Sequence, residues 1–245
     1  MNGVATAPGA GTVLNALATG QGSAFAIDVE TTATVELAAD AATVTGEIDG
    51  VPDADTRLIE RCVERVVDRF GDGEGGTVVT DSEVPMAAGL KSSSAAANAT
   101  VLATLDALGV DVVAGDEARG DESIATIDAC RIGVNAARDV GVTITGAFDD
   151  AAASMLGGVV VTDNTEDALL ARETREWDVL VWTPPERAYS ADADVDRCEN
   201  VAEMADLVAE LALDGRFGEA MTVNGLAYSA ALDFDTDPAV EAMLH

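Results

Sequence analysis

The sequence predicts an α+β fold, in which strands and helices follow one another without strict alternation. Residues 3–48 have the patterns of strands and turns, whereas residues 92–140 favour helices. A doubly wound parallel sheet would need regular alternation of strand and helix, so this order argues against that class. Of the 245 residues, 48% are hydrophobic, which is enough for a sizeable core.

Two patterns identify the elements of the first half. β-branched residues between turn signals are typical of strands. Apolar residues at helical spacing predict helices, most clearly over 54–70, where charged side chains fill the opposite face and a Gly-rich stretch follows. Small and apolar residues over 92–108 suit a buried helix. The predicted elements are strands over 29–38, 42–48 and 77–83, helices over 54–70, 92–108 and 123–140, and a loop over 84–91.

The second half combines short β-like segments with helices. Pro184 stops one of these segments, and Pro238 suits the first turn of a last helix. The predicted elements are strands over 142–145, 159–162 and 177–183 and helices over 148–156, 194–213, 217–232 and 237–244. We place a domain seam near residue 145, between an N-terminal domain, 1–145, and a C-terminal domain, 146–245.

The charge of the chain is strongly negative. Lysine and arginine number 13 and aspartate and glutamate 45, so the formal net charge is −32. Few cations remain to displace phosphate counterions, which argues against a nucleic-acid partner. Aspartates (27) outnumber glutamates (18) and Lys91 is the only lysine, a composition typical of halophilic proteins. We therefore expect loss of fold or activity at low salt, where self-repulsion is unscreened, unless this is an ordinary acidic enzyme.

Nothing in the sequence favours a membrane protein or an exported one. No apolar stretch reaches the roughly 18 residues of a membrane span, and no signal-peptide pattern marks the N-terminus. Lipidation motifs and basic amphipathic helices are also missing. We therefore expect a cytoplasmic protein without a membrane anchor, and we leave its oligomeric state open.

The cysteines and the histidine limit the possible chemistry. Cys62, Cys130 and Cys198 are far apart in apolar helical patterns, which predicts buried, reduced thiols and no metal site. The only histidine is His245 at the end of the chain, so catalysis by an internal histidine is excluded. Acid–base chemistry must then fall to carboxylates, Lys91 or tyrosine.

The sharpest motif is the segment 85–98, in which a Gly-containing loop enters a helix through three hydroxyls. The N-terminus of a helix presents unpaired N–H groups and a positive dipole end, so it binds phosphates readily. Lys91 adds a cation at this point. The alternative is a plain Ser N-cap on a buried, Ala-rich helix. The residues predicted to bind phosphates are Pro85, Ala87, Ala88, Gly89, Leu90, Lys91, Ser92, Ser93 and Ser94.

Two better-known nucleotide-binding motifs do not fit. Lys91 follows Leu90 and not a glycine, so the segment is not a P-loop. Gly9 and Gly11 lack the third glycine of the dinucleotide fingerprint. A P-loop NTPase and a Rossmann dehydrogenase are therefore disfavoured.

Two further segments hold polar residues in apolar surroundings. Asp149 and Asp150 are adjacent at a strand-to-helix turn, where carboxylates could orient a substrate hydroxyl or take its proton. Their alternative use is as an N-cap with an extra acid in the first turn. In the turn-rich segment 5–28, Asn15 and Ser23 are candidates for a wall of the substrate site, unless the segment is only a structural turn.

Together, these three segments resemble the GHMP kinase superfamily. Residues 85–95 fit its second motif, Pro-x-x-x-Gly-Leu-x-Ser-Ser-x-Ala, in order. Within the superfamily the chain is similar to the archaeal shikimate kinase family. The similar parts are the N-terminal segment 10–24, the Gly-Leu-Lys-Ser-Ser-Ser form of the loop, Thr-Gly-Ala-Phe-Asp-Asp at 145–150, and the segment 221–228. The resemblance covers nearly the whole chain.

The resemblance implies a two-domain GHMP-kinase-like α+β fold that binds ATP and Mg²⁺ at residues 85–95. It implies transfer of the ATP γ-phosphate to the 3-hydroxyl of shikimate, in the pathway to aromatic amino acids. Ser92 and Ser93 match the positions that contact phosphate and Mg²⁺. Lys91 is expected to hold the phosphates and to take part in catalysis.

The resemblance also assigns roles to acidic residues. Asp150 matches the aspartate that serves as base in mevalonate kinases, and Asp149 is a second candidate. Asp139 stands eleven residues before Asp150, where those enzymes have a Mg²⁺-binding glutamate, although its side chain is shorter by a methylene. Its alternative reading is a solvated acid near a helix end.

One departure concerns the C-terminal part. GHMP kinases have a third, Gly-rich motif there, and nothing after Gly225 resembles it. We therefore expect that the chain lacks the last strands of the fold, or that this loop has been lost. The alternative functions are another GHMP kinase, for homoserine or mevalonate, and a non-catalytic GHMP-fold sensor. Arg138 and Arg187 are candidates for binding the shikimate carboxylate, unless they are exposed surface arginines.

Overall fold

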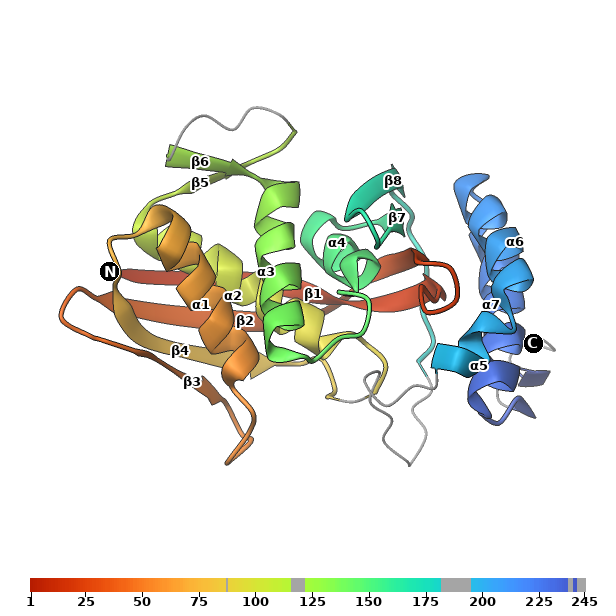
Figure 1. Ribbon diagram of the computed structural model, residues 1–245, viewed down its shortest axis with the longest axis horizontal. Helices are drawn as coiled ribbons and strands as arrows, with labels where there is room; N and C mark the ends of the chain where they lie inside the picture. The colour runs from red at the N-terminus through yellow and green to blue at the C-terminus, as the bar shows by residue number, and fades with distance from the viewer. Residues whose placement is uncertain (87, 116–121, 182–194, 238–239, 242–245) are drawn as a thin grey trace.

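The computed structural model describes residues 1–86, 88–115, 122–181, 195–237 and 240–241 (Figure 1). The strands of its large sheet are β1 (Asn2–Leu14), β2 (Gln21–Ala38), β3 (Val44–Ile48), β4 (Gly75–Ser82), β7 (Val159–Asp163) and β8 (Ala168–Glu173). A second, two-stranded sheet pairs β5 (Asp111–Val113) with β6 (Ser123–Ala125). The helices are α1 (Arg57–Phe70), α2 (Ser92–Leu108), α3 (Thr126–Val140), α4 (Phe148–Leu156), α5 (Val195–Glu199), α6 (Ala202–Leu213) and α7 (Phe217–Leu232).

The long strand β2 joins the two halves of the large sheet. One of its edges pairs with β1 over most of its length. On the other edge, Gln21–Phe25 pair antiparallel with β7, and Thr31–Ala38 pair antiparallel with β4. The sheet therefore continues across residue 145, where the sequence analysis places a domain seam, and that boundary remains a prediction.

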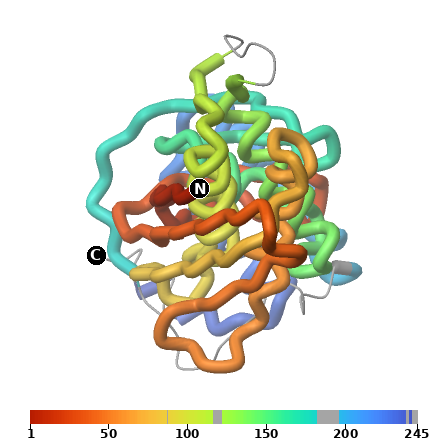
Figure 2. Tube along the Cα trace, turned by 90° about the vertical axis from the view of Figure 1, so that its left-hand side faces the viewer, coloured from red at the N-terminus to blue at the C-terminus, as the bar shows by residue number. Residues whose placement is uncertain are grey.

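Helix α2 lies directly on β1 and β2 because its residues are small. A side chain at Gly3 of β1 would come within 2.1 Å of the backbone oxygen of Ala103. Helices α1 and α3 flank α2, and their apolar faces complete the core around Val35, Val63 and Leu105 (Figures 1 and 2). Helix α2, with small and apolar residues on most of its sides, is the kind of helix expected in such a buried position.

Helices α6 and α7 form the C-terminal end of the structure, drawn in blue in Figure 1. Their side chains pack with Val13 and Leu14 of β1 and with Val159 of β7, in a cluster that includes Phe217. Tyr228 of α7 donates a hydrogen bond of 2.7 Å to the backbone carbonyl of Asn15. The C-terminal helices thus hold the turn between β1 and β2.

Most of the predicted helices are confirmed. The helices over 92–108, 148–156 and 217–232 have the predicted bounds. All three cysteines are buried, as predicted, and burial raises the pKa of the Cys62 thiol to about 12. In the described part of the chain, no helix combines the length and the apolar character that crossing a membrane requires.

Other segments differ from the prediction. The strand predicted over 142–145 is wrong, because this segment is irregular and pairs with no strand. The helix predicted over 123–140 begins only at Thr126, since the residues before it pair with β5 instead. The predicted helix 194–213 is divided into α5 and α6, and β8 was not predicted. Residues 177–181 carry no strand pairing, while the rest of the predicted strand 177–183 and most of the predicted helix 237–244 lie outside the described residues.

Candidate active site

The N-terminus of α2 is open to a ligand. Lys91 occupies its N-cap position with a left-handed backbone, φ 61° and ψ 39°, and no described side chain caps the helix. The first helical hydrogen bond runs from the N–H of Ala95 to the carbonyl of Lys91, at 3.1 Å. The N–H groups of Ser92, Ser93 and Ser94 therefore have no acceptor within the helix, which is the condition for binding an anion. The alternative of a serine N-cap is wrong, since the helix already begins at Ser92.

The loop before α2 rests on β1. The carbonyl of Leu90 accepts a hydrogen bond of 3.1 Å from the N–H of Ala10. A Cβ on Gly9 would lie 2.8 Å from the same carbonyl oxygen, so a larger residue there would displace the loop. Of the other predicted loop residues, Pro85 and Gly89 are exposed and Ala88 is half-buried, whereas Ala87 lies outside the described residues.

Lys91 and Asp150 form an ion pair that joins the start of α2 to the first turn of α4. The distance from Nζ to Oδ2 is 3.1 Å, and the side chains are only 19% and 11% exposed. Burial lowers the pKa of Lys91, but the charges of Asp150 and Asp149 outweigh it, so the pKa is raised and the ammonium stays charged. The Oδ1 atom of Asp150 is buried and finds no donor among the described residues. Because a buried carboxylate oxygen without a partner is costly, Oδ1 is the atom available to a ligand.

Asp149 is buried at 4% exposure and held by Asn164. Its Oδ1 accepts a 2.7 Å hydrogen bond from Asn164 Nδ2, and its backbone N–H donates to Asn164 Oδ1 at 3.1 Å. A Cβ at Gly22 of β2 would lie 2.6 Å from the carboxylate, so this approach requires glycine. Burial and the charge of Asp150 raise the pKa of Asp149 to about 7, although Lys91 and Asn164 oppose that shift. Two adjacent carboxylates thus have different environments, which is the usual basis for separate acid–base roles.

The sequence analysis missed Asn164 and its neighbour Thr162. Both are buried, and the Thr162 hydroxyl lies 2.8 Å from Asn164 Oδ1. The signal that could have found them is two polar residues at alternate positions where an apolar strand ends. Alternation directs Thr162 of β7 and Asn164, just after the end of the strand, to the same side, which meets α4.

The chain matches known proteins along its whole length. The family described as GHMP kinases N terminal domain matches residues 57–158, which contain α2 and both members of the ion pair. A shikimate kinase of Halobacterium salinarum is 66% identical over 245 residues, which are 100% of this chain and 83% of that protein. A shikimate kinase of Methanococcoides burtonii is 51% identical over 241 residues, which are 98% of this chain and 80% of that protein. The chain belongs to the archaeal shikimate kinases of the GHMP kinase superfamily.

Solved structures share the fold of this shikimate kinase family member at much lower identity. The mevalonate kinase of Methanococcus jannaschii has a TM-score of 0.62 and 13% identity, covering 94% of this chain and 80% of that chain. The homoserine kinase of Cytophaga hutchinsonii has a TM-score of 0.58 and 16% identity, covering 92% of this chain and 70% of that chain. The predicted GHMP-kinase-like α+β fold is confirmed.

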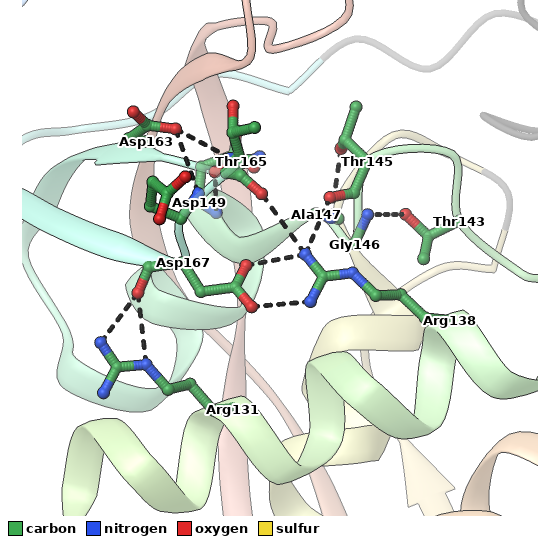
Figure 3. A network of polar contacts seen from close by, with 12 residues as sticks. Arg131, Arg138, Thr143, Thr145, Gly146, Ala147, Asp149, Asp163, Thr165 and Asp167 are labelled. Carbon is green, nitrogen blue, oxygen red and sulfur yellow. Dashed lines mark hydrogen bonds and ion pairs between the residues drawn. The ribbon is translucent and has the colours of Figure 1, made fainter.

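In this shikimate kinase family member, Arg138 does not face a substrate but ties α3 to the turn between β7 and β8 (Figure 3). Its guanidinium pairs with both carboxylate oxygens of Asp167, at 2.6 and 2.7 Å, and donates to the carbonyl of Thr145 at 3.1 Å. Because Asp167 already pairs with its charge and holds it at this turn, its predicted role in binding the shikimate carboxylate is not supported. Arg187, the other candidate, lies outside the described residues.

The structure does not bring Asp139 to the Lys91–Asp150 pair. Its carboxylate faces α1 and accepts hydrogen bonds from Arg61 at 2.7 Å and from Arg65 at 2.8 and 2.9 Å. These bonds lower the pKa of Asp139 to about 2. A carboxylate already shared by two guanidinium groups has little capacity left for a metal, so the Mg²⁺ assignment is corrected to a helix–helix ion pair.

The two predicted substrate residues also have structural partners. Ser23 is fully buried and its hydroxyl donates to the carbonyl of Val160 at 2.7 Å, so it cannot contact a substrate in this structure. The side-chain oxygen of Asn15 accepts from the N–H of Leu17 at 2.9 Å, which is the turn geometry typical of asparagine. The alternative of a structural turn therefore describes this segment.

Two surface hollows lie outside this cluster. One, of about 280 Å³, lies between α1 and α3 and includes Arg65 and Arg131. The other, of about 260 Å³, includes Trp177 and Phe217. Neither is lined by the loop predicted to bind phosphates (85–94, here called the phosphate loop) or by Asp149 and Asp150. The candidate site is therefore defined by the chemistry of its residues. Among the described residues, no group of three or more histidines, cysteines, aspartates or glutamates could hold a metal ion.

Proposed function

We propose that this chain transfers the γ-phosphoryl group of ATP to the 3-hydroxyl of shikimate. The observation that carries the proposal is the Lys91–Asp150 ion pair at an open helix N-terminus, with Asp150 Oδ1 left for a ligand. Curated relatives named shikimate kinase, 66% and 51% identical, support this substrate. One structural neighbour of low identity holds AMPPCP and magnesium, which supports a nucleotide and Mg²⁺ as ligands.

The start of α2 provides the groups that a triphosphate needs. The free N–H groups of Ser92, Ser93 and Ser94 and the dipole of a 17-residue helix favour an anion there. The Lys91 ammonium supplies a full positive charge at the same end. The hydroxyls of Ser92 and Ser93 are only half-buried or exposed, so they fit a Mg²⁺ ion as oxygen ligands. When bound, Mg²⁺ supplies further neutralisation of phosphate charge.

Asp150 is the group that would receive the proton. In the reaction the substrate oxygen forms a bond to the γ-phosphorus, the bond from that phosphorus to the β–γ bridging oxygen breaks, and ADP leaves. The hydroxyl proton passes to Asp150 Oδ1, which has no other donor among the described residues. Lys91 holds Oδ2 and so fixes the direction in which Oδ1 points.

An assay of ATP consumption in about 2–3 M KCl, where surface charge is screened, tests the proposal. Shikimate, homoserine and mevalonate are each added with Mg²⁺. Of these three alcohols, we expect only shikimate to give turnover. Turnover only with another alcohol would correct the substrate, and ATP binding without any turnover would favour a sensor.

The variant Asp150→Asn tests the assigned base. We expect its kcat to fall by about 100-fold or more, because the amide cannot accept the hydroxyl proton, with the KM for ATP changed by less than about twofold. Asp111→Asn, at an exposed position of β5, is the matched control. Unchanged kcat in Asp150→Asn would remove Asp150 from the mechanism.

A further inference from the structure

Three buried side chains beside the candidate base form one hydrogen-bonded unit. They are Asp149 of α4, Thr162 of β7 and Asn164 of the turn that follows, and each is less than 5% exposed. Asn164 Nδ2 lies 2.7 Å from Asp149 Oδ1, and Asn164 Oδ1 lies 2.8 Å from the Thr162 hydroxyl and 3.1 Å from the backbone N–H of Asp149. No site assignment in the resemblance includes Thr162 or Asn164.

These contacts allow only one orientation of the Asn164 amide. The backbone N–H of Asp149 can only donate, so the amide atom that faces it must be the oxygen. The amide nitrogen then faces the Asp149 carboxylate and donates to it. This hydrogen bond requires an acceptor oxygen on Asp149, and it favours the ionised carboxylate over the protonated one.

The turn that carries Asn164 is itself held from two sides. The backbone N–H of Asn164 donates to the carbonyl of Gly20 at 2.8 Å. Arg138 donates to the carbonyl of Asn164 at 3.3 Å and pairs with Asp167 of the same turn, as Figure 3 shows around Asp149. Asn164 therefore presents its amide to Asp149 from an anchored position.

We propose that Asn164 is a positioning residue of the phosphoryl transfer reaction, which holds the Asp149 carboxylate in one rotamer and as a hydrogen-bond acceptor beside the Lys91–Asp150 pair. The inference rests on the proposed function. The charged groups that act on Asp149 are Asp150 of its own helix and Lys91 at the start of α2. An ionised Asp149 is a second negative charge that acts on Lys91. Lys91 then stays charged and pairs with Oδ2 of Asp150, while Oδ1 stays available to the substrate. Without the Asn164 donor, burial favours the protonated form of Asp149, and the active ionisation state requires a higher pH.

The pH dependence of kcat in Asn164→Ala distinguishes a residue that positions Asp149 from one that only stabilises the fold. We expect kcat to fall about fivefold at pH 7 and to recover almost fully toward pH 9, as the acidic limb moves up by about one pH unit from about 7. The KM for ATP should stay within about twofold, because the amide forms its hydrogen bonds with Asp149 and Thr162 and not with the loop 85–94. A merely structural role would lower kcat equally at every pH.

Two variants of Thr162 refine the test. Thr162→Val removes the hydroxyl that orients the Asn164 amide. It should move the acidic limb of the kcat profile to higher pH, by less than Asn164→Ala does. Thr162→Ser keeps the hydroxyl and should restore the wild-type profile. If Asn164→Ala fails to fold, Thr162→Val provides the same comparison. Glu166→Gln, at an exposed position of the same turn, is the matched control.

A carbon-13 NMR titration of the Asp149 carboxyl separates failure of this inference from failure of the proposed function. The pKa of Asp149 should be higher in Asn164→Ala than in the wild type. An unchanged Asp149 pKa, or an unchanged pH profile in a folded variant, would overturn the role of Asn164. If the wild type does not phosphorylate shikimate, the proposed function fails, and a shifted pKa still shows that Asn164 holds the carboxylate.

Discussion

Lys91 stands in a backbone conformation that costs a non-glycine residue about 1–2 kcal/mol. Its φ of 61° lets the loop turn into α2 while the side chain reaches Asp150 across the site. A glycine would turn the chain without strain but would carry no charge. The strain is therefore best explained by the ammonium, which is the only lysine charge in the chain.

This explanation predicts that Lys91→Gly and Lys91→Met weaken nucleotide binding equally but differ in stability. The KM for ATP should rise about tenfold or more in both Lys91→Gly and Lys91→Met, because both lose the charge-assisted contact. Lys91→Gly should be more stable than Lys91→Met by about 1 kcal/mol, since only glycine relieves the backbone strain. Kinetics and chemical denaturation check the two effects. Equal ATP affinity in all three proteins would reduce Lys91 to a structural role.

The raised pKa of Asp149 makes the free energy of unfolding depend on pH. Its pKa is about 7 in the folded chain against an ordinary 3.8, so the folded chain binds this proton more tightly than the unfolded chain. The resulting stabilisation is complete below about pH 4 and is lost as the pH rises through 7. Above that pH, the buried charge lowers the free energy of unfolding by up to about 4 kcal/mol.

Asp149→Asn should remove this loss. The difference in unfolding free energy between the variant and the wild type should be near zero at pH 4 and grow to as much as about 4 kcal/mol in favour of the variant at pH 8. Denaturation in constant high salt at several pH values measures it, with the exposed Asp81→Asn as control. A pH-independent difference would contradict the raised pKa. Higher stability together with lower activity is the usual behaviour of a functional residue.

At the scale of elements, α1 and α3 are joined by charge as well as by apolar packing. Asp139 of α3 bridges Arg61 and Arg65, which are one turn apart on α1. All three side chains are about a third exposed, so solvent screens the pairs and limits their contribution to about 1 kcal/mol. The carboxylate thus serves the helix interface.

Asp139→Asn tests this assignment against the Mg²⁺ role. The free energy of unfolding at pH 7 should fall by about 1 kcal/mol or less. The Mg²⁺ concentration for half-maximal activity should not change, because the Asp139 carboxylate is bound by the arginines of α1. An increase of several-fold in that concentration, with the fold intact, would return Asp139 to the metal site.

At the scale of the whole molecule, a net charge of −32 on 245 residues repels itself. The Debye length is about 10 Å at 0.1 M salt and about 3 Å at 1 M, so high salt removes most of this repulsion. The surface ion pairs involve only the few arginines and do not balance the excess.

We therefore expect the unfolding temperature to rise steeply between about 0.1 and 2 M KCl and to level off at higher concentrations, where screening is nearly complete. Circular dichroism during heating measures it. NaCl at equal ionic strength should act similarly, since screening depends on ionic strength. A chain that is folded and fully active in dilute buffer would contradict halophilic adaptation.

The sequence by itself determined the features that depend on neighbouring residues. The bounds of α2 follow from a run of small, apolar residues, and the prediction of a phosphate-binding loop rests on Gly89, Lys91 and the serines that follow. The same local patterns could not separate a strand from an irregular segment at 142–145, because a short β-branched stretch suits both.

Only the tertiary structure decided which polar residues meet. The register of β2 against β7 places Gly22 opposite Thr162, and the turn after β7 then places Asn164 against Asp149. The same packing buries Ser23 and turns Asp139 toward α1. These outcomes depend on contacts between residues far apart in the chain. Local patterns can mark a polar residue such as Asn164 as unusual, but they do not say which residue it contacts.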